Sequence, residues 1–397
     1  MYPILLLKSG KEANVGFRHP WIFSGALEEV PAGLAHGSLV RVSDKNGRIL
    51  GTGTYSAFSS IAVRVLDFKE TTIDEAWFVK RFEAARNRRQ LLGYGPGTDT
   101  TAFRVVFGES DGIPGLVVDR YVDVFVMQIA TAGLEALRET VVKALKTVFE
   151  PRILIERSDL TVRKEEKLED VTAVRIGDEP GMVEFLEHGE RFIADVRHGQ
   201  KTGFFLDQKD LRQTVRQLAK GRSVLNLFSY SGATGIMAMK GGAASVHNVD
   251  GSDVALDLCK KQAEMHAISA DQFTTEKADI FPWFGDKERA GMYGLVIVDP
   301  PALIKSHKDI EEGKKAYHFL NRSAMRLVKD GGIFVTSSCS HFLSEEDFAF
   351  LLRRASVQAG LSLSVLSVIR QSPDHPMSVY FPEAAYLKTF VCEVARS

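Results

Sequence analysis

The sequence contains very little cysteine and no long apolar segment. Only three of its 397 residues are cysteine, namely Cys259, Cys339 and Cys392. This sparse, odd number excludes a disulfide scaffold and favours a reducing compartment. No apolar run approaches the roughly 18 residues of a membrane span. The apolar stretch near Met1 is too short for a secretory signal. We therefore expect a cytoplasmic protein without a membrane segment.

An excess of charge of one sign is also missing. The 50 Lys and Arg residues nearly balance the 51 Asp and Glu residues, which gives a formal net charge of −1. This balance argues against a protein that is coated uniformly with nucleic acid, although it permits a local basic patch. Hydrophobic residues make up 45% and charged residues 25% of the chain, which is typical of globular proteins. The length predicts two or three domains.

Changes in pattern along the chain predict three domains. Residues 1–70 read as a small β domain, with strands at 39–42 and 61–66 and a hairpin turn at 44–47. Residues 71–188 read as an α+β domain. They include helices at 74–92 and 134–148, and the charged run 164–170 is expected to be a solvated loop or helix.

Residues 189–397 read as an α/β domain with a mostly parallel sheet. Apolar strands alternate with helices there, as in successive βαβ units. The strands are expected at 224–228, 245–249, 295–298 and 333–336. Ligands of such sheets bind at the carboxyl ends of the strands, so the residues at those ends are the candidates for function.

Two segments mix basic and aromatic residues in a way that suits RNA. Arg18 and Trp21 lie in one, between residues 17 and 23, and could provide a phosphate contact and a stacking surface. The other is the basic end of the helix at 74–92, where Arg81, Arg88 and Arg89 can share a broad face. An aromatic core cluster and a solvated helix face are the simpler alternatives.

The first strand ends carry groups that could bind a nucleoside. The turn from Asn226 to Gly232 is rich in small residues but lacks the G-x-G-x-x-G pattern of dinucleotide folds. Asp250 ends the next strand, where an acid can accept hydroxyl groups of a ribose, and Ser252 or Asp253 can cap the following helix instead. Asp279 could accept from an adenine amino group with Phe281 packing on the ring, although a solvated loop aspartate is an equal alternative.

Two further strand ends carry reactive groups. Asp299 is followed by Pro300 and Pro301, which stiffen the backbone directly after a buried strand. Cys339 follows the next strand in a polar run, whereas Cys259 and Cys392 fit buried positions of a helix and a strand. If these two strands are neighbours, Asp299 and Cys339 share one edge of the sheet.

These residues together resemble those of class I S-adenosylmethionine (SAM)-dependent methyltransferases. More narrowly, they are similar to the RlmI family of large-subunit rRNA cytosine-5 methyltransferases. The resemblance extends to residues 199–208, to Asp374-His375-Pro376 and to Tyr386-Leu387-Lys388, and it covers nearly the whole chain. It implies a PUA-like RNA-binding domain, a middle α+β domain and a Rossmann-like methyltransferase domain. It also implies 23S rRNA as the partner and leaves a homodimer open.

The resemblance implies a role for each candidate residue. Cys339 would attack C6 of cytosine and so activate C5 for methylation, while Asp299 would hold the base and Pro300 and Pro301 would lie beside it. The residues implied to hold SAM are Lys201, Thr202, Phe204, Asp207, Gln208, Asn226, Phe228, Ser229, Tyr230, Gly232, Asp250, Asp279, Phe281 and Asp299. No metal is implied.

Three alternatives stay open, and one of them is a related enzyme with the same chemistry that acts on another rRNA cytosine. Asp-Pro-Pro also resembles the motif of amino-directed adenine or guanine methyltransferases, but Ala302 stands where those enzymes have an aromatic residue and Cys339 would then be idle. Ala302 also replaces the lysine that members of the RlmI-like family often have there. The remaining alternative is a non-catalytic RNA-binding module on a methyltransferase fold.

Overall fold

The structure is a computed structural model, and it describes residues 2–285 and 290–396. The chain forms two compact units, which are described separately below. The first comprises Met1–Leu206 and Pro373–Ala384, and the second comprises Asp207–Ser372 and Ala385–Ser397. Among the described residues, no helix is both long and apolar enough to cross a membrane.

The first unit begins with a five-stranded sheet in the order β1-β3-β4-β5-β2. Its strands are β1 (Ile4–Leu6), β2 (Trp21–Phe23), β3 (Leu39–Ser43), β4 (Ile49–Tyr55) and β5 (Ile61–Asp67), and the short helix α1 is Ala13–Gly16. The predicted hairpin turn joins β3 to β4. There the Asp44 carboxylate accepts from the Asn46 and Arg48 amides, and Gly47 has φ +79°. This conformation is easily reached only by glycine.

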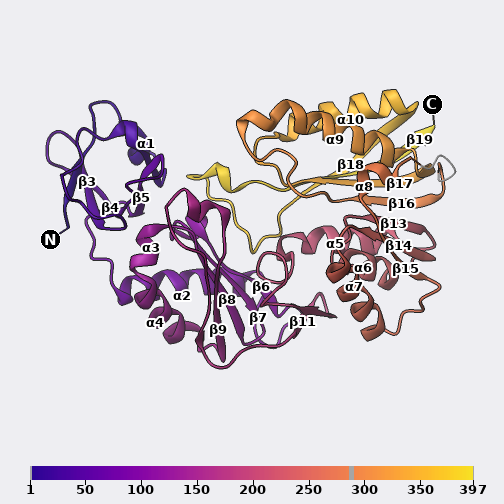
Figure 1. Cartoon of the computed structure of the whole chain (residues 1–397), viewed down its shortest axis with the longest axis horizontal. Helices are drawn as coiled ribbons and strands as arrows, with labels where there is room; N and C mark the ends of the chain where they lie inside the picture. Colours follow the sequence, from indigo (N-terminus) through magenta and orange to yellow (C-terminus); the bar gives the residue numbers. More distant parts are fainter. Residues whose placement is uncertain (1, 286–289, 397) are drawn as a thin grey trace. The chain divides into compact units, whose positions relative to one another are not determined.

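The second part of this unit is a sheet in the order β10-β9-β8-β7-β6, with three helices packed against it (Figure 1). The strands are β6 (Ala102–Phe107), β7 (Leu116–Tyr121), β8 (Val124–Ile129), β9 (Ile153–Ser158) and β10 (Val171–Ile176). The helices are α2 (Glu75–Leu91), α3 (Ala132–Ala136) and α4 (Arg138–Phe149). The prediction of a single helix at 134–148 is therefore wrong, because Leu137 interrupts the helical backbone between α3 and α4. The hairpin of β11 (Val183–Glu187) and β12 (Glu190–Ala194) follows.

A buried aspartate, Asp374, bonds the segment Pro373–Ala384 to the rest of the first unit. Both the side chain and the carbonyl of Asp374 accept hydrogen bonds, from the Arg104 amide at 2.8 Å and from the Arg89 guanidinium at 2.7 Å. Trp21 packs edge-on against Phe381, with ring centroids 4.8 Å apart. These contacts tie residues near the C-terminus to the N-terminal and middle parts of the chain.

The second unit is built on a seven-stranded sheet in the order β15-β14-β13-β16-β17-β19-β18. The strands are β13 (Ser223–Leu227), β14 (Ser245–Asp250), β15 (Phe273–Lys277), β16 (Tyr293–Val298), β17 (Val328–Ser338), β18 (Leu361–Arg370) and β19 (Lys388–Arg396). The five strands from β15 to β17 are parallel, and β19 runs antiparallel to both of its neighbours. Strand β16 is apolar and buried along almost its whole length, as a strand covered on both faces requires.

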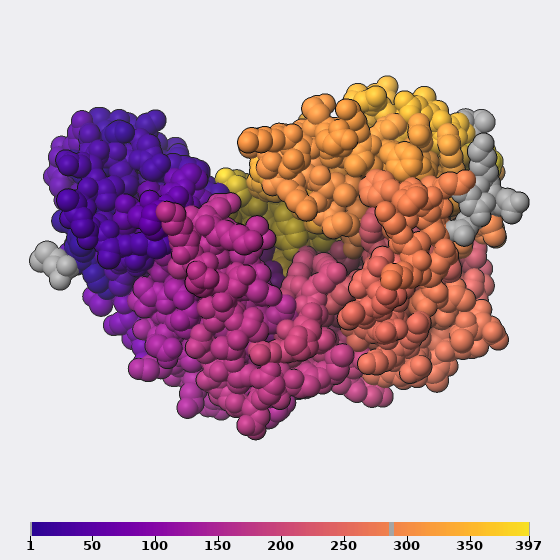
Figure 2. All heavy atoms as spheres, in the orientation of Figure 1, coloured from indigo at the N-terminus to yellow at the C-terminus, as the bar shows by residue number. Residues whose placement is uncertain are grey.

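Helices cover both faces of this sheet (Figure 1). They are α5 (Lys209–Leu218), α6 (Ala233–Lys240), α7 (Asp253–Met265), α8 (Ile280–Trp283), α9 (Ile310–Met325) and α10 (Glu345–Ala359). Apolar residues of α9 and α10 form one core with β16 and β17, and Figure 2 shows the outer surface of these two helices in orange. Among the residues that the structure describes, the short 3₁₀ helices of both units are Ser24–Ala26, Gly108–Asp111, Thr161–Lys164, Leu206–Gln208, His307–Asp309 and Pro382–Ala384. The predicted Rossmann-like α/β sheet is confirmed.

Candidate active site

The loop after β13 makes a tight turn toward α6. Phe228 and Tyr230 have φ values of +58° and +47°, in the left-handed region that side chains rarely adopt. Gly232, with φ +72°, precedes the first residue of α6. A Cβ atom on Gly232 would lie 2.2 Å from Sγ of Cys259, which is buried on α7. The loop backbone is therefore pressed closely against α7.

The Asp250 carboxylate fixes this loop. One of its oxygens accepts from the Tyr230 amide at 2.8 Å and the other accepts from the Ser252 amide at 2.9 Å. The Ser252 hydroxyl caps α7 by accepting from the Ala255 amide. The prediction that another residue caps this helix and spares Asp250 is thus confirmed. Each carboxylate oxygen has a second acceptor site, so Asp250 can still accept from hydroxyl groups of a ligand.

A cavity of about 570 Å³ opens beside the same loop. It is lined by Phe228, Gly251, Lys277, Ala278, Asp279 and Ile280. Asp279 caps α8 by accepting from the Phe281 amide at 3.1 Å. The Phe281 ring lies outside this lining and stacks on Phe319, with centroids 6.1 Å apart. An aromatic wall, an acid and this volume suit a nucleoside-sized ligand.

Three residues expected to hold SAM are buried in the protein. The Asn226 side chain is 2% exposed and donates to the Asn248 amide oxygen at 2.9 Å, so it joins β13 to β14. In the first unit, Thr202 is fully buried and donates to Asp119 at 2.6 Å, and Phe204 packs edge-on against Phe185. In this structure these three side chains are almost completely buried against the protein, so their assignment to SAM stays a prediction. Lys201 lies with its ammonium 4.3 Å from the Phe205 ring centroid.

The start of α5 is tied to the end of β16. The Gln208 amide donates to the Asp299 carboxylate at 2.7 Å. The neighbouring Asp207 carboxylate accepts from the Tyr386 hydroxyl at 2.5 Å, and its backbone carbonyl accepts from the Ser372 amide. Gln208 therefore orients one oxygen of Asp299 at the carboxyl edge of the sheet.

Asp299 and Cys339 lie at the ends of neighbouring parallel strands. In the β16–β17 register Val298 pairs with Thr336. The half-buried Cys339 thiol faces the Pro300 carbonyl, with Sγ 4.0 Å from the oxygen. Pro300 is buried and Pro301 is exposed. The prediction that Asp299 and Cys339 share one edge of the sheet is confirmed.

A buried tyrosine on α9 holds the residues on both sides of Cys339. The Tyr317 hydroxyl accepts from the Ser338 hydroxyl at 3.0 Å and also lies 3.0 Å from the Ser340 hydroxyl. The Ser340 hydroxyl in turn accepts from the Ile304 amide at 3.1 Å, in the loop after β16. Burial raises the pKa of Tyr317 above its ordinary value, so the phenol stays neutral. Sequence reasoning missed Tyr317 because its helix position is also an ordinary core position.

Lys388 is a second residue whose role sequence reasoning missed. Its side chain is almost completely buried, and its ammonium donates to the Ser340 carbonyl at 2.8 Å and to the Leu343 carbonyl at 2.6 Å. Burial lowers the pKa of Lys388 to about 8, while the nearby Cys339 and Glu345 act in the opposite direction. The only signal in the sequence was its place in the Tyr-Leu-Lys segment.

The residues expected to bind RNA are only partly available. Arg89 is 1% exposed, and its guanidinium donates to both Asp111 oxygens at 2.7 and 2.8 Å. It cannot contact RNA, so this prediction is wrong. Arg88 pairs with the same carboxylate but is 43% exposed. Arg81 lies over the Trp77 ring at 5.0 Å and stays 37% exposed.

The other basic and aromatic segment combines an exposed and a packed residue. Arg18 is exposed, and its guanidinium lies 5.7 Å from the Tyr380 ring centroid. The Trp21 indole donates to Glu109 at 2.8 Å, so its polar edge is already occupied.

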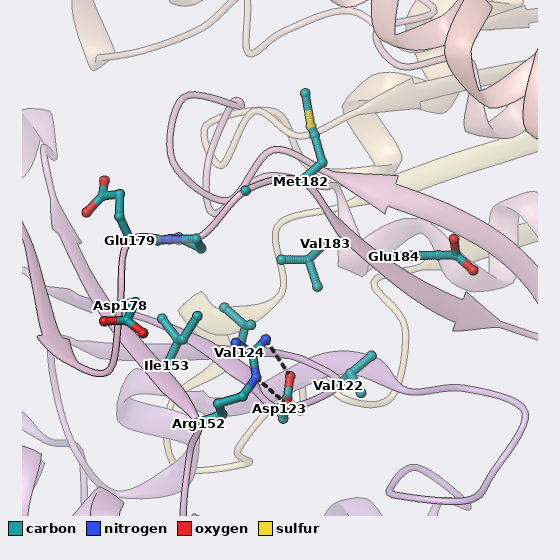
Figure 3. A pocket seen from close by; sticks show the side chains of 12 residues that line it. Val122, Asp123, Val124, Arg152, Ile153, Asp178, Glu179, Met182, Val183 and Glu184 are labelled. Atoms are coloured by element: carbon teal, nitrogen blue, oxygen red, sulfur yellow. Dashed lines mark hydrogen bonds and ion pairs between the residues drawn. The ribbon is translucent and has the colours of Figure 1, made fainter.

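A separate cavity of about 310 Å³ in the first unit does not fit a nucleic acid (Figure 3). Four carboxylates line it, and the one arginine in its lining, Arg152, pairs with one of them, Asp123. The remaining carboxylates are Asp178, Glu179 and Glu184. Excess negative charge disfavours phosphate.

Comparison with known proteins gives the class that this fold and site define. Residues 124–391 match the family of S-adenosylmethionine-dependent methyltransferases, and residues 5–68 match the PUA-like domain. A crystal structure of a methyltransferase with SAH has a TM-score of 0.85 at 22% identity, covering 98% of this chain and 100% of that chain, which shows the shared fold. The chain is thus a SAM-dependent methyltransferase.

Full-length relatives give the particular family. A protein of Aeromonas salmonicida called ribosomal RNA large subunit methyltransferase I is 37% identical over 396 residues, covering 98% of this chain and 99% of its own length. A protein of the same name in Pseudoalteromonas atlantica is 36% identical over 390 residues, covering 98% of each chain. The chain belongs to this family of ribosomal RNA large subunit methyltransferases, which confirms the predicted membership.

Proposed function

We propose that the protein methylates C5 of a cytosine in large-subunit rRNA, with Cys339 as the nucleophile. The observation that carries this proposal is the placement of Cys339 beside the Asp299 loop, on the same sheet edge as the cofactor loop. The curated relatives carry the name of a large-subunit rRNA methyltransferase, which supports the substrate.

The chemistry requires one thiolate and one base. The thiolate adds to C6 of cytosine, and the electron pair of the C5–C6 double bond makes C5 nucleophilic. C5 then takes the methyl group that bound SAM supplies. A base removes the C5 proton, and the electrons left behind restore the double bond and expel the thiolate. The target base must leave its stack to reach the thiol.

Asp299 is placed to hold that base. Gln208 already donates to one of its carboxylate oxygens, and because a carboxylate has about four acceptor sites, Asp299 can also accept from the N4 amino group of cytosine or share a proton with N3. The loop of Pro300 and Pro301 continues from Asp299 along the same edge and would line the base. No aromatic residue stands at position 302 to stack on an adenine, which disfavours the amino-directed alternative.

The cofactor would bind along the β13 loop and the cavity beside it. Asp250 would accept from the ribose hydroxyls and Asp279 would lie near the adenine, with Phe228 as the apolar wall. The Ser229 hydroxyl is buried and has no hydrogen-bond partner among the described residues, as expected of a group that a ligand would satisfy. Tyr230, Gly232, Asp207, Gln208 and Lys201 complete the proposed set.

RNA binding would use exposed cations outside the sheet edge. Arg18, Arg81 and Arg88 keep exposed guanidinium groups, and Trp21 would contribute only its ring face. Binding through phosphates would weaken as salt rises. We further propose that the chain has three domains, with boundaries at residues 70 and 188. The proposed location is the cytoplasm.

A homodimer is the proposed assembly. β18 is one of the two edge strands of the large sheet, and its Val365 and Leu366 side chains are 53% and 54% exposed. Exposed apolar edge strands tend to pair with another chain. Sedimentation of the wild type should give a dimer that Leu366→Lys dissociates, and a monomeric wild type would contradict this assembly.

Activity assays test the proposed reaction. The wild type should transfer a labelled methyl group from SAM to large-subunit rRNA and create 5-methylcytosine, detected by bisulfite sequencing. Cys339→Ala should abolish transfer while calorimetry still shows SAM binding. Cys392→Ala, which alters a buried thiol on β19, is the matched control and should stay active. Full turnover by Cys339→Ala would favour an amino-directed enzyme, and absence of SAM binding would favour a non-catalytic module.

A further inference from the structure

Lys388 makes two contacts to the loop that carries Cys339. It is the first residue of β19 and pairs with Ser338 across the β17–β19 register. Its ammonium donates to the carbonyls of Ser340 and Leu343. These carbonyls lie one and four residues beyond Cys339, so a single cation bonds the start and the end of this loop.

The surroundings make this cation unusual. Lys388 is 7% exposed, and burying an ammonium carries a cost in free energy unless opposite charge compensates it. The ionisable groups beside Lys388 are Glu345 on α10 and Arg370, which pairs with Lys388 across the β18–β19 register. The Arg370 guanidinium also pairs with the Glu345 carboxylate at 3.0 Å, so Glu345 offsets only part of the Lys388 charge. Tyr317 on α9 bonds the neighbouring Ser338 and Ser340 hydroxyls. Tyr317 is held neutral by burial, and Glu345 and Cys339 both raise the pKa of Lys388. A Cys339 thiolate is therefore one of the anions that offset its burial.

We propose that Lys388 is a positioning residue that holds the Cys339 loop and, as a buried cation, favours the thiolate form of Cys339. A thiol beside a cation ionises more readily, and the attraction is stronger in a site with little water. This inference rests on the proposed function, because it concerns the nucleophile of that reaction.

The role has an upper pH limit. Since burial lowers the pKa of Lys388 to about 8, the ammonium predominates at neutral pH and is lost as the pH rises above 8. The effect on Cys339 therefore operates in the range where the enzyme would work. A lysine that only filled space would give no such limit.

Alkylation kinetics test this role without using methyl transfer. Burial raises the pKa values of Cys259 and Cys392 to about 12, so iodoacetamide should label Cys339 selectively, as peptide mass analysis can verify. The rate would be measured from pH 6 to 9.5 for the wild type, Lys388→Met, Lys388→Gln and Lys388→Arg. Lys329→Met, which changes an exposed lysine on β17, is the control.

The variants should separate charge from hydrogen bonding. Lys388→Met and Lys388→Gln should react about tenfold more slowly at pH 7, with the alkylation midpoint about one pH unit higher. Lys388→Arg should restore the midpoint, and Lys329→Met should match the wild type. If Lys388→Met fails to fold, Lys388→Gln carries the comparison because it keeps a donor. An unchanged midpoint in the neutral variant overturns the inference, whereas an active Cys339→Ala enzyme would instead overturn the proposed function.

Discussion

Gly232→Ala is a sharp test of the cofactor loop. Gly232 has φ +72°, and an added Cβ would stand 2.2 Å from Sγ and 3.2 Å from Cβ of Cys259. The left-handed conformation costs a residue with a side chain about 1–2 kcal/mol. Forcing a methyl group into a packed core costs about 1–3 kcal/mol more. We expect a total loss of roughly 2–5 kcal/mol in the free energy of unfolding.

A second glycine gives the matched control. Gly331 has φ +67°, but nothing lies within 4 Å of the position that an added Cβ would take, so Gly331→Ala should lose only the conformational part. Urea unfolding would measure both losses, and calorimetry should show weaker SAM binding only for Gly232→Ala. Adding Cys259→Ala removes the closest atom and should recover part of the loss. Equal unfolding costs for the two glycine variants, with SAM binding intact in both, would refute the packing argument.

Four further outcomes follow from the structure. Asp250→Ala should weaken SAM binding about tenfold or more in calorimetry, since it removes a charged acceptor, and unchanged affinity would count against the ribose role. Tyr317→Phe should lower the free energy of unfolding by about 1–3 kcal/mol, because buried serine hydroxyls lose their partner; an unchanged urea midpoint would be inconsistent with that network. Arg89→Met should cost about 3–5 kcal/mol by leaving buried Asp111 poorly paired, while SAM affinity stays the same; a stable variant with weaker RNA binding would reinstate Arg89 as an RNA contact. The pKa of Lys388 is about 8 in the folded state and 10.5 in the unfolded chain. From pH 8 to 10 the unfolded chain therefore binds more protons, so the free energy of unfolding of the wild type, measured in urea, should rise relative to that of Lys388→Met. A fall in this difference over the same pH range would contradict the lowered pKa of Lys388.

The main sheet and its reactive edge could be predicted from local patterns. Continuous apolar runs identify strands that are covered on both faces, and parallel strands place their carboxyl ends together. This is why Asp299 and Cys339, forty residues apart, could be placed on one edge. The turn at Gly232 could also be predicted from the sequence, but its close contact with the Cys259 thiol could not.

Buried polar residues could not be predicted in the same way. Glu166 lies in a charged run that is expected to be solvated, yet it is 1% exposed and accepts from Arg64 at 2.6 Å. Arg89 looks like one more cation on a basic helix until its partner Asp111 is placed beside it. Asn226 follows the strand pattern but faces Asn248 on the next strand. In each case the partner is distant in sequence, so the local pattern resembles a surface or a ligand site.

The most direct test of the central claim is to trap the covalent intermediate. An rRNA fragment with 5-fluorocytosine at the target position should form an adduct with the wild type and SAM, because the fluorine at C5 blocks removal of a proton. The account predicts a complex that survives denaturing electrophoresis and maps by mass spectrometry to the peptide containing Cys339. Cys392→Ala should form the same complex and Cys339→Ala should form none. An enzyme that methylates the unmodified RNA yet gives no adduct, or gives one at another residue, would contradict the account.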